Sequence, residues 1–206
     1  MKRILFSIIY TSLFLGCSSQ STKENKDKIN NPLKDAEFII SDKFVIADDE
    51  TFSAYLKETL SELNIEDFSK NSVGLSDESW QKVMMEWKET TKLYLRKNAT
   101  DNGENIVIKY SEVGPSEFWL NKLTTDMKKQ ESAFSKTTGM NFEMIDSGMK
   151  KYKNRYSYIY FISKISYEGM SRYGLQCIIS VNNKSYQVII NTYEKLLFED
   201  VVTNIK

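Results

Sequence analysis

RYSYIYFISKISYEGMSRYGLQCIISVNNKSYQVIIN, residues 155–191, contains three runs of strand-like sequence separated by two turn signals. The runs are rich in β-branched and aromatic side chains, which fit a pleated, half-buried surface. Gly169 marks the first turn and Asn182-Asn183 marks the second, because both residue types tolerate the backbone conformations that tight turns need. The predicted strands are residues 155–167, 173–181 and 185–191. Two consecutive hairpins of this kind predict an antiparallel meander.

Four amphipathic helices are predicted around the meander, each with apolar residues spaced three or four positions apart. Acidic, hydroxyl or amide side chains stand where these helices would begin, and such groups cap free backbone N–H groups. The helices and their inner faces are one beginning at Asp48-Asp49 (Phe52, Tyr55, Leu56, Leu60, Leu63), one beginning at Ser76 (Trp80, Val83, Met84, Trp87), one over residues 116–136 (Trp119, Leu120, Leu123, Met127, Phe134) and one from Asn191 to the end of the chain (Leu197, Val201, Ile205).

Shorter strands are predicted before and between these helices. Asn102-Gly103 is a strong hairpin signal between two apolar runs. The further predicted strands are residues 37–40, 43–46, 93–97, 105–110 and 140–145. Taken together, the pattern predicts an α+β fold in which helices pack on the face of an antiparallel sheet.

The first residues have the pattern of a secretory signal peptide. Lys2 and Arg3 precede an apolar run over residues 4–15, which ends in Gly16-Cys17. The run is shorter than the roughly twenty residues that a membrane-spanning helix needs. The segment resembles the bacterial lipoprotein signal, in which a cysteine after a small residue is acylated and becomes the first mature residue. The alternative is an ordinary signal peptide that is cut elsewhere, with Cys17 present by chance.

The lipoprotein resemblance implies a domain organisation. Residues 1–16 are the predicted signal peptide, and Cys17 with residues 18–34 is the predicted lipidated anchor and tether. The tether is polar and charged, so it cannot bury enough surface to fold. Residues 35–206 are the predicted single folded domain. We expect palmitate-type acyl chains on Cys17 to hold the domain on a bacterial membrane, facing the periplasm from the outer membrane.

Composition excludes several kinds of chemistry. The chain has no histidine, which excludes Ser-His-Asp and Cys-His catalysis and His-ligated zinc. With 28 basic and 28 acidic residues, it has no basic excess of the kind that binds nucleic acid. Cys177 is expected to be a buried strand thiol. We predict no catalytic residue, no metal and no cofactor.

The C-terminal half, from about Ser116 to Lys206, resembles the PsbP/Mog/DcrB-like fold in the order of its elements and in its apolar spacing. The resemblance implies an accessory, assembly or binding role rather than catalysis. The residues that carry it are Phe142 to Gly148, Tyr156-Ser157-Tyr158-Ile159-Tyr160, Tyr186-Gln187-Val188-Ile189-Ile190, and the closing Thr192, Glu194, Phe198, Val201 and Ile205.

Two aromatic groups are candidate binding surfaces, because such side chains offer flat apolar area with a polar handle. In each case the alternative is that the rings pack in the core. The candidates are Trp80, Trp87 and Trp119 on the helices, and Tyr156, Tyr158 and Tyr160 on one face of a strand.

Two charged clusters also have alternative interpretations. Asp48-Asp49-Glu50 could ligate calcium, but it lacks the spacing of a calcium loop, and helix capping is the favoured interpretation. The second cluster, Lys150, Lys151, Lys153 and Arg155, could contact lipid phosphates. Its alternative is a solvated entry to a strand.

The favoured functional hypothesis is a membrane-tethered, non-enzymatic binding or assembly module with an envelope protein as its partner. A second hypothesis is a carboxylate-dependent envelope hydrolase or transferase that uses Glu143, Asp146 or Glu168, which would need two acids with separated pKa values. A third is an immunity-type or structural lipoprotein that binds one protein through an exposed apolar patch.

Overall fold

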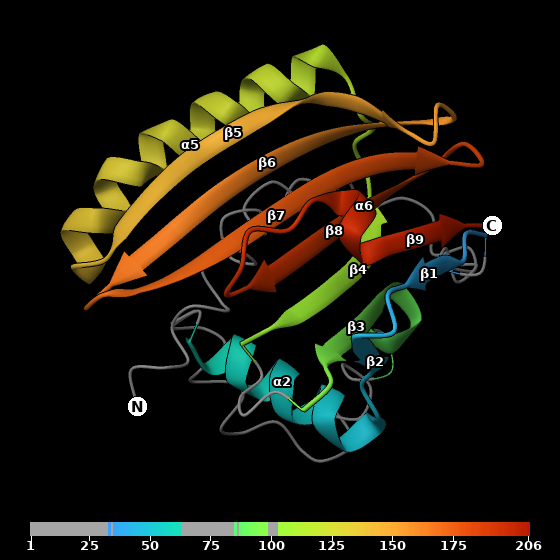
Figure 1. Ribbon diagram of the computed structural model, residues 1–206, viewed down its shortest axis with the longest axis horizontal. Coiled ribbons are helices and arrows are strands. Elements are labelled where there is room, and N and C mark those ends of the chain that lie inside the picture. The colour runs from blue at the N-terminus through green and yellow to red at the C-terminus, as the bar shows by residue number, and fades with distance from the viewer. Residues whose placement is uncertain (1–32, 34, 63–84, 86, 99–102) are drawn as a thin grey trace, which may run out of the picture.

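The computed structural model describes residues 33, 35–62, 85, 87–98 and 103–206. Its centre is a seven-stranded sheet in the order β2-β3-β4-β8-β7-β6-β5, and β1 and β9 form a separate pair (Figure 1). The strands are β1 (Phe38–Ile40), β2 (Phe44–Ile46), β3 (Thr91–Arg96), β4 (Asn105–Ser111), β5 (Asn141–Tyr152), β6 (Tyr156–Tyr167), β7 (Met170–Val181), β8 (Lys184–Thr192) and β9 (Val202–Ile205), and the helices are α2 (Asp49–Glu62), α5 (Glu117–Thr138) and α6 (Phe198–Val201). The predicted α+β class, with helices on an antiparallel sheet, is confirmed.

The predicted meander is present as β6, β7 and β8, joined by tight turns. Asn182 and Asn183 have φ angles of 51° and 61°, and Gly169 has a φ of 81°. These left-handed conformations match the twist of the flanking strands, which is why Asn and Gly mark such turns. A further turn that was not predicted joins β5 to β6, where Lys153 and Asn154 have φ angles of 48° and 56°.

Two of the predicted helices are present where expected. Helix α2 buries Phe52, Tyr55 and Leu56. Helix α5 begins after Ser116, whose hydroxyl accepts a hydrogen bond from the backbone N–H of Trp119, and it ends at Gly139 in the left-handed conformation. The helix predicted from Ser76 is described only at its end, where residue 85 and residues 87–90 are helical. Its earlier residues, and the side chains of Leu60, Leu63 and Phe134, lie outside the described residues.

Strand β5 is longer than predicted. The sequence indicated a strand over residues 140–145, but β5 continues to Tyr152 alongside β6. The register shifts between Met144 and Asp146, so Ile145 is an extra residue opposite β6. Such a bulge breaks the two-residue periodicity of a strand. The alternation of apolar and polar residues is therefore lost where the prediction ended.

The predicted C-terminal helix is wrong. Strand β8 runs through Asn191 to Thr192, and α6 covers only Phe198–Val201. The last residues form β9, which pairs antiparallel with β1 so that Phe38 lies opposite Ile205. Val201, Val202, Thr203 and Ile205 are β-branched, so their side chains favour a strand once a pairing partner is present.

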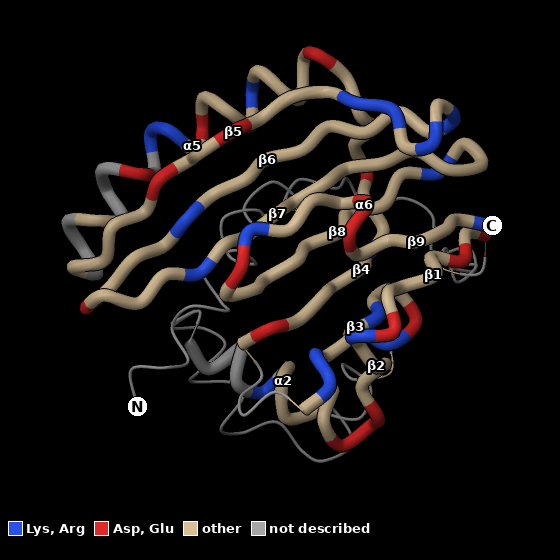
Figure 2. Tube along the Cα trace, viewed as in Figure 1, with Lys and Arg blue, Asp and Glu red and all other residues tan. Residues whose placement is uncertain are grey.

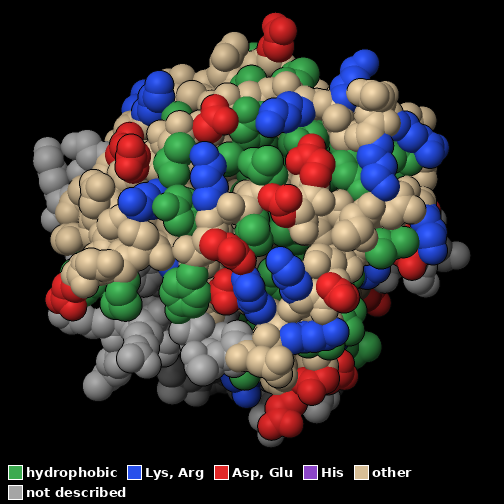
Figure 3. Space-filling view, in the orientation of Figure 1, with side chains coloured by type: hydrophobic (Ala, Val, Ile, Leu, Met, Phe, Trp, Pro, Cys, Tyr) green, Lys and Arg blue, Asp and Glu red, His purple; other side chains and the backbone are tan. Residues whose placement is uncertain are grey.

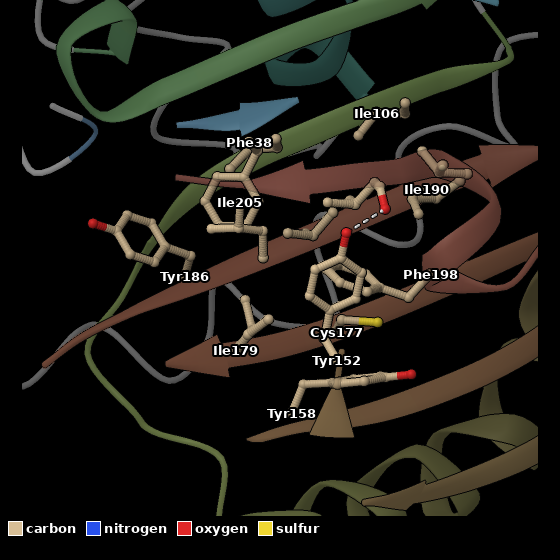
Figure 4. Packing of buried hydrophobic residues seen from close by; sticks show 14 of the residues in the cluster. Phe38, Ile106, Tyr152, Tyr158, Cys177, Ile179, Tyr186, Ile190, Phe198 and Ile205 are labelled. Atoms are coloured by element: carbon tan, nitrogen blue, oxygen red, sulfur yellow. Dashed lines mark hydrogen bonds between the residues drawn. The ribbon is translucent and has the colours of Figure 1, made fainter. Parts of the chain in front are cut away.

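Both faces of the seven-stranded sheet are buried. We call one the strand-covered face, because β1, β9 and α6 pack on it and place Phe38 and Phe198 in its core (Figure 4). We call the other the helix-covered face, because α2 and α5 place Leu56 and Met127 in its core. The three strands of the meander contribute to both cores, which explains why their sequences are apolar almost throughout.

The folded part begins before the predicted boundary at Asp35. Leu33, which the sequence placed in the tether, is buried in the core of the strand-covered face. Cys17 and the predicted signal peptide lie outside the described residues. Among the helices that the structure describes, none is both long enough and apolar enough to cross a membrane.

Candidate functional site

The structure places the predicted aromatic residues on opposite faces of the sheet. Trp87 and Trp119 are half-buried and pack against the core of the helix-covered face. The three tyrosines belong to the strand-covered face, where Tyr156 and Tyr158 are buried and Tyr160 is half-buried. Trp80 lies outside the described residues. The two groups therefore do not combine into one site.

The tyrosine face is occupied by the protein itself. The Tyr158 hydroxyl donates to Glu199 Oε1 at 2.7 Å, and its ring centroid lies 5.0 Å from that of Phe198. Burial raises the pKa of Tyr158, and the bond to the Glu199 carboxylate raises it further. Only Tyr160 keeps a partly exposed ring, with its hydroxyl donating to Asp146 Oδ2 at 3.1 Å. Packing in the core, the alternative named above, describes Tyr156 and Tyr158.

The acidic candidates have structural roles or are exposed. Asp48 Oδ1 accepts a hydrogen bond from the backbone N–H of Thr51 at 2.8 Å, and hydrogen bonds from Thr51 lower the Asp48 pKa. Helix capping is thereby confirmed for Asp48. Glu143, Asp146 and Glu168 are all exposed. Across the described ranges, no group of three acidic or cysteine side chains is arranged to hold a metal ion.

A row of polar side chains crosses the helix-covered face, and we call it the polar floor. The strand register places its members on three adjacent central strands, where Asn105 and Lys109 of β4 lie opposite Asn191 and Gln187 of β8. On the other side of β8, Ile189 lies opposite Gln176 of β7. Alternate residues of a strand point to the same face, so all of these side chains share one surface. The polar floor consists of Asn105, Lys109, Gln176, Gln187 and Asn191.

Gln176 is the most unusual member of the polar floor. Its side chain is 1% exposed, and among the described residues neither its amide nitrogen nor its amide oxygen has a hydrogen-bond partner. Its cross-strand neighbours are Phe161 and Ile189, both apolar. A buried amide without a partner costs about 1–3 kcal/mol. Such a group in a native protein calls for a specific explanation.

Lys109 and Asn191 are two further members of the polar floor whose polar groups are incompletely paired among the described residues. Asn191 Nδ2 donates to Asn105 Oδ1 at 2.8 Å, but the Asn191 side-chain oxygen is buried and has no partner within the described ranges. The Lys109 ammonium pairs with no acidic group in the part of the chain that is described, and burial lowers its pKa. The floor thus offers an amide, a carbonyl oxygen and a cation within a mainly apolar layer.

Arg172, on the same face as the floor, shows how this protein normally satisfies a buried polar group. Its guanidinium donates to the Gly103 carbonyl at 3.3 Å and to the Tyr193 hydroxyl, and it lies 4.5 Å from the Tyr193 ring. A Cβ atom at Gly103 would lie 1.8 Å from Arg172 Nη2, so glycine permits this approach. The contrast identifies Gln176 as an exception within the same sheet.

The polar floor was not predicted from the sequence. Its only signal is the presence of amide and lysine side chains inside strands whose other residues are apolar on both faces. That signal identifies a site only after the register shows that residues from β4, β7 and β8 are neighbours.

Comparison with known proteins gives a similarity of fold. No protein-family model matches the sequence, and no curated protein matches it. Among solved structures, the chain is similar to the solution structure of cyanobacterial PsbP (CyanoP) from Synechocystis sp. PCC 6803. The two share 10% sequence identity over 86% of each chain, with a TM-score of 0.41.

Proposed function

We propose that this protein is a membrane-tethered binding module of a bacterial cell envelope, anchored by lipid on Cys17. Its ligand or partner presents a polar group to the polar floor and apolar surface to the layer around it. The observation that carries the proposal is the buried Gln176 amide, whose nitrogen and oxygen have no hydrogen-bond partner in the part of the chain that the structure describes. An amide is both a donor and an acceptor, so it suits a ligand that carries an amide or a carboxylate.

The surroundings of Gln176 favour binding over a purely structural role. Lys109 supplies a cation on the same face, and Trp87 and Trp119 pack at the edge of the same apolar layer. Binding sites for small ligands are mostly apolar, with a few polar groups that fix orientation. The membrane anchor itself is supported by the resemblance of residues 2–17 to a lipoprotein signal.

Cys17→Ser is expected to release the protein from the membrane fraction of a bacterial host. The thioether-linked acyl chains would be lost, and the remaining described helices offer no membrane span. The measurement is fractionation combined with incorporation of a palmitate analogue. If the variant stays in the membrane fraction and the wild type carries no label, the anchor is disproved.

Gln176→Met is expected to raise the free energy of unfolding by about 1–3 kcal/mol, because it replaces an unpaired buried amide by an apolar side chain of similar length. The melting temperature should rise by roughly 2–4 °C for each kcal/mol. The same variant should lose the ligand or partner that wild type retains from detergent-solubilised envelope, as identified by mass spectrometry. This combination of gained stability and lost binding is typical of a residue kept for function.

Tyr160→Phe is the matched control for Gln176→Met. It also removes one polar group from a central strand, but on the opposite face, where the hydroxyl bonds to Asp146. Capture of the ligand should be unchanged in this variant. A Gln176→Met protein that is less stable than wild type would show that the amide has a structural partner, and the polar floor would then not be a binding site.

A further inference from the structure

We propose that one end of the domain, marked by the β5–β6 turn, lies against an anionic lipid surface. We call Lys150, Lys151, Lys153 and Arg155 the basic turn. The proposal rests on the proposed anchor at Cys17 for the place where the chain meets the membrane. It adds the side of the domain that faces the lipid and the residues that contact it.

The N-terminal segment enters the fold at Asp35 and Glu37, at one end of the sheet. The Asp35 carbonyl accepts a hydrogen bond from Asn182 Nδ2 at 2.9 Å, and its carboxylate pairs with Lys184. Two residues later, Glu37 and Lys206 exchange backbone hydrogen bonds of 3.2 and 3.0 Å. The chain that leads from Cys17 therefore enters beside the β7–β8 turn and the C-terminal residue.

The basic turn lies at this same end of the sheet. Tyr152 pairs with Tyr156 across the β5–β6 turn, and Tyr158 pairs with Ile179 near the end of β7. In addition, Lys153 Nζ donates to the Thr203 carbonyl of β9 at 2.9 Å, and β9 is the strand that pairs with β1. Strand β1, which follows Asp35 and Glu37, and the basic turn are thus held together through β9.

The positive charge of the basic turn is not neutralised by ion pairs within the described residues. No acidic side chain among the described residues forms an ion pair with any of its four members. Three of them lie over tyrosine rings instead, with Arg155 4.8 Å from the Tyr156 centroid and Lys150 4.9 Å from the Tyr160 centroid. In contrast, Lys184 and Lys206 at the same end are paired with Asp35 and Glu37.

The distribution of charge agrees with these contacts. Lys and Arg gather around the β5–β6 turn and towards the C-terminus, at the right of the trace (Figure 2). On the visible surface the left and centre carry both signs, whereas basic side chains predominate at the right-hand edge (Figure 3). A lipid anchor and a basic surface are two weak signals that together give stable membrane association. Each lysine or arginine near an anionic leaflet contributes about fivefold to the partition coefficient.

The test uses the chain from residue 17 with Cys17→Ser, so that only the protein surface can bind. Its sedimentation with vesicles of phosphatidylcholine alone is compared with vesicles that contain one part phosphatidylglycerol to two parts phosphatidylcholine. We expect binding only to the anionic vesicles, and loss of that binding as salt shortens the Debye length to about 3 Å. Equal binding to both vesicles, or to neither, would overturn the proposal.

Charge-reversal variants test whether the basic turn is the part of the protein that contacts the lipid. Lys151→Glu combined with Arg155→Glu should lower the partition coefficient by at least about twentyfold. The control, Lys128→Glu combined with Lys129→Glu, makes the same change of net charge in the second half of α5, towards the opposite end of the sheet. Both pairs are exposed, and unchanged melting temperatures would verify folding. If both double variants lose binding equally, attraction is non-specific and the basic turn has no special role.

The vesicle and acylation experiments distinguish the proposed lipid contact of the basic turn from the proposed lipid anchor at Cys17. If Cys17 is acylated but the unacylated chain does not bind anionic vesicles, the lipid anchor is supported and the proposed lipid contact of the basic turn is wrong. If the unacylated chain binds anionic vesicles through the basic turn but Cys17 carries no acyl chain, the surface contact stands and the lipid anchor fails. Binding of the wild type that is abolished by inorganic phosphate at constant ionic strength would identify a free-phosphate site and overturn the lipid contact.

Discussion

Phe198→Ala is expected to lower the free energy of unfolding by about 3–5 kcal/mol. Phe198 is 1% exposed, and its ring centroid lies 5.4 Å from that of Tyr152 and 5.0 Å from that of Tyr158. Truncation would remove these contacts and leave a cavity where α6 meets the sheet (Figure 4). Domains are typically stable by only about 5–15 kcal/mol, so much of the total would be lost.

Denaturant unfolding measures this change, provided that the slope against denaturant stays constant. Leu197→Ala is the control, because Leu197 is the adjacent residue but is exposed. That substitution should change the stability by no more than about 0.5 kcal/mol. Equal effects of the two substitutions would show that α6 does not close the core of the strand-covered face.

The second large effect is a loss of stability in alkali. Burial raises the pKa values of Tyr152, Tyr158 and Tyr186, which are all almost completely buried. An unfolded tyrosine titrates near pH 10. Below that pH both states keep the proton, and these groups do not change the stability. Above it the unfolded state loses protons that the folded state retains, so unfolding becomes progressively more favourable.

Each such tyrosine costs up to about 1.4 kcal/mol for every pH unit above 10. For Tyr158, whose pKa is raised most, the loss reaches up to about 1.4 kcal/mol at pH 11, and Tyr152 and Tyr186 add to it in the same direction. The measurement is the free energy of unfolding across this range, with phenolate absorbance recorded for the folded protein. Tyr158→Phe should reduce the loss by up to about 1.4 kcal/mol at pH 11. Ionisation of all the tyrosines near pH 10 without unfolding would contradict the prediction.

Elements that depend on residues close together in the sequence were predicted correctly, whereas elements that depend on distant residues were not. Tight turns are local, so Asn182-Asn183 and Gly169 were recognised from residue type alone. Helix α5 was also local, because Ser116 caps it and its apolar spacing continues for several turns. The α+β class follows from such elements without any knowledge of long-range contacts.

The C-terminal residues required information from the other end of the chain. Leu197, Val201 and Ile205 have a helical spacing, but Leu197 is exposed and Ile205 packs opposite Phe38. Pairing between β9 and β1 supplies hydrogen bonds that no local pattern reveals. Tertiary contacts therefore overrode the apparent helical period.

The candidate site was the part least accessible from sequence. Aromatic residues were named as candidate binding surfaces, with core packing as the favoured interpretation, and Tyr156 and Tyr158 belong to the core. Gln176 attracted no attention as a single amide in an apolar strand. Its significance depends on complete burial and on two missing hydrogen bonds, and both are properties of the folded state.

The pairing of β1 with β9 also sets an order of events in time. The first strand of the fold finds its partner only in residues 202–205, almost at the end of the chain. Contacts so distant in sequence form slowly, because a long loop must close before they give any stabilisation. A growing or partly transported chain therefore cannot complete the strand-covered face until residues 202–205 are free to pair with β1.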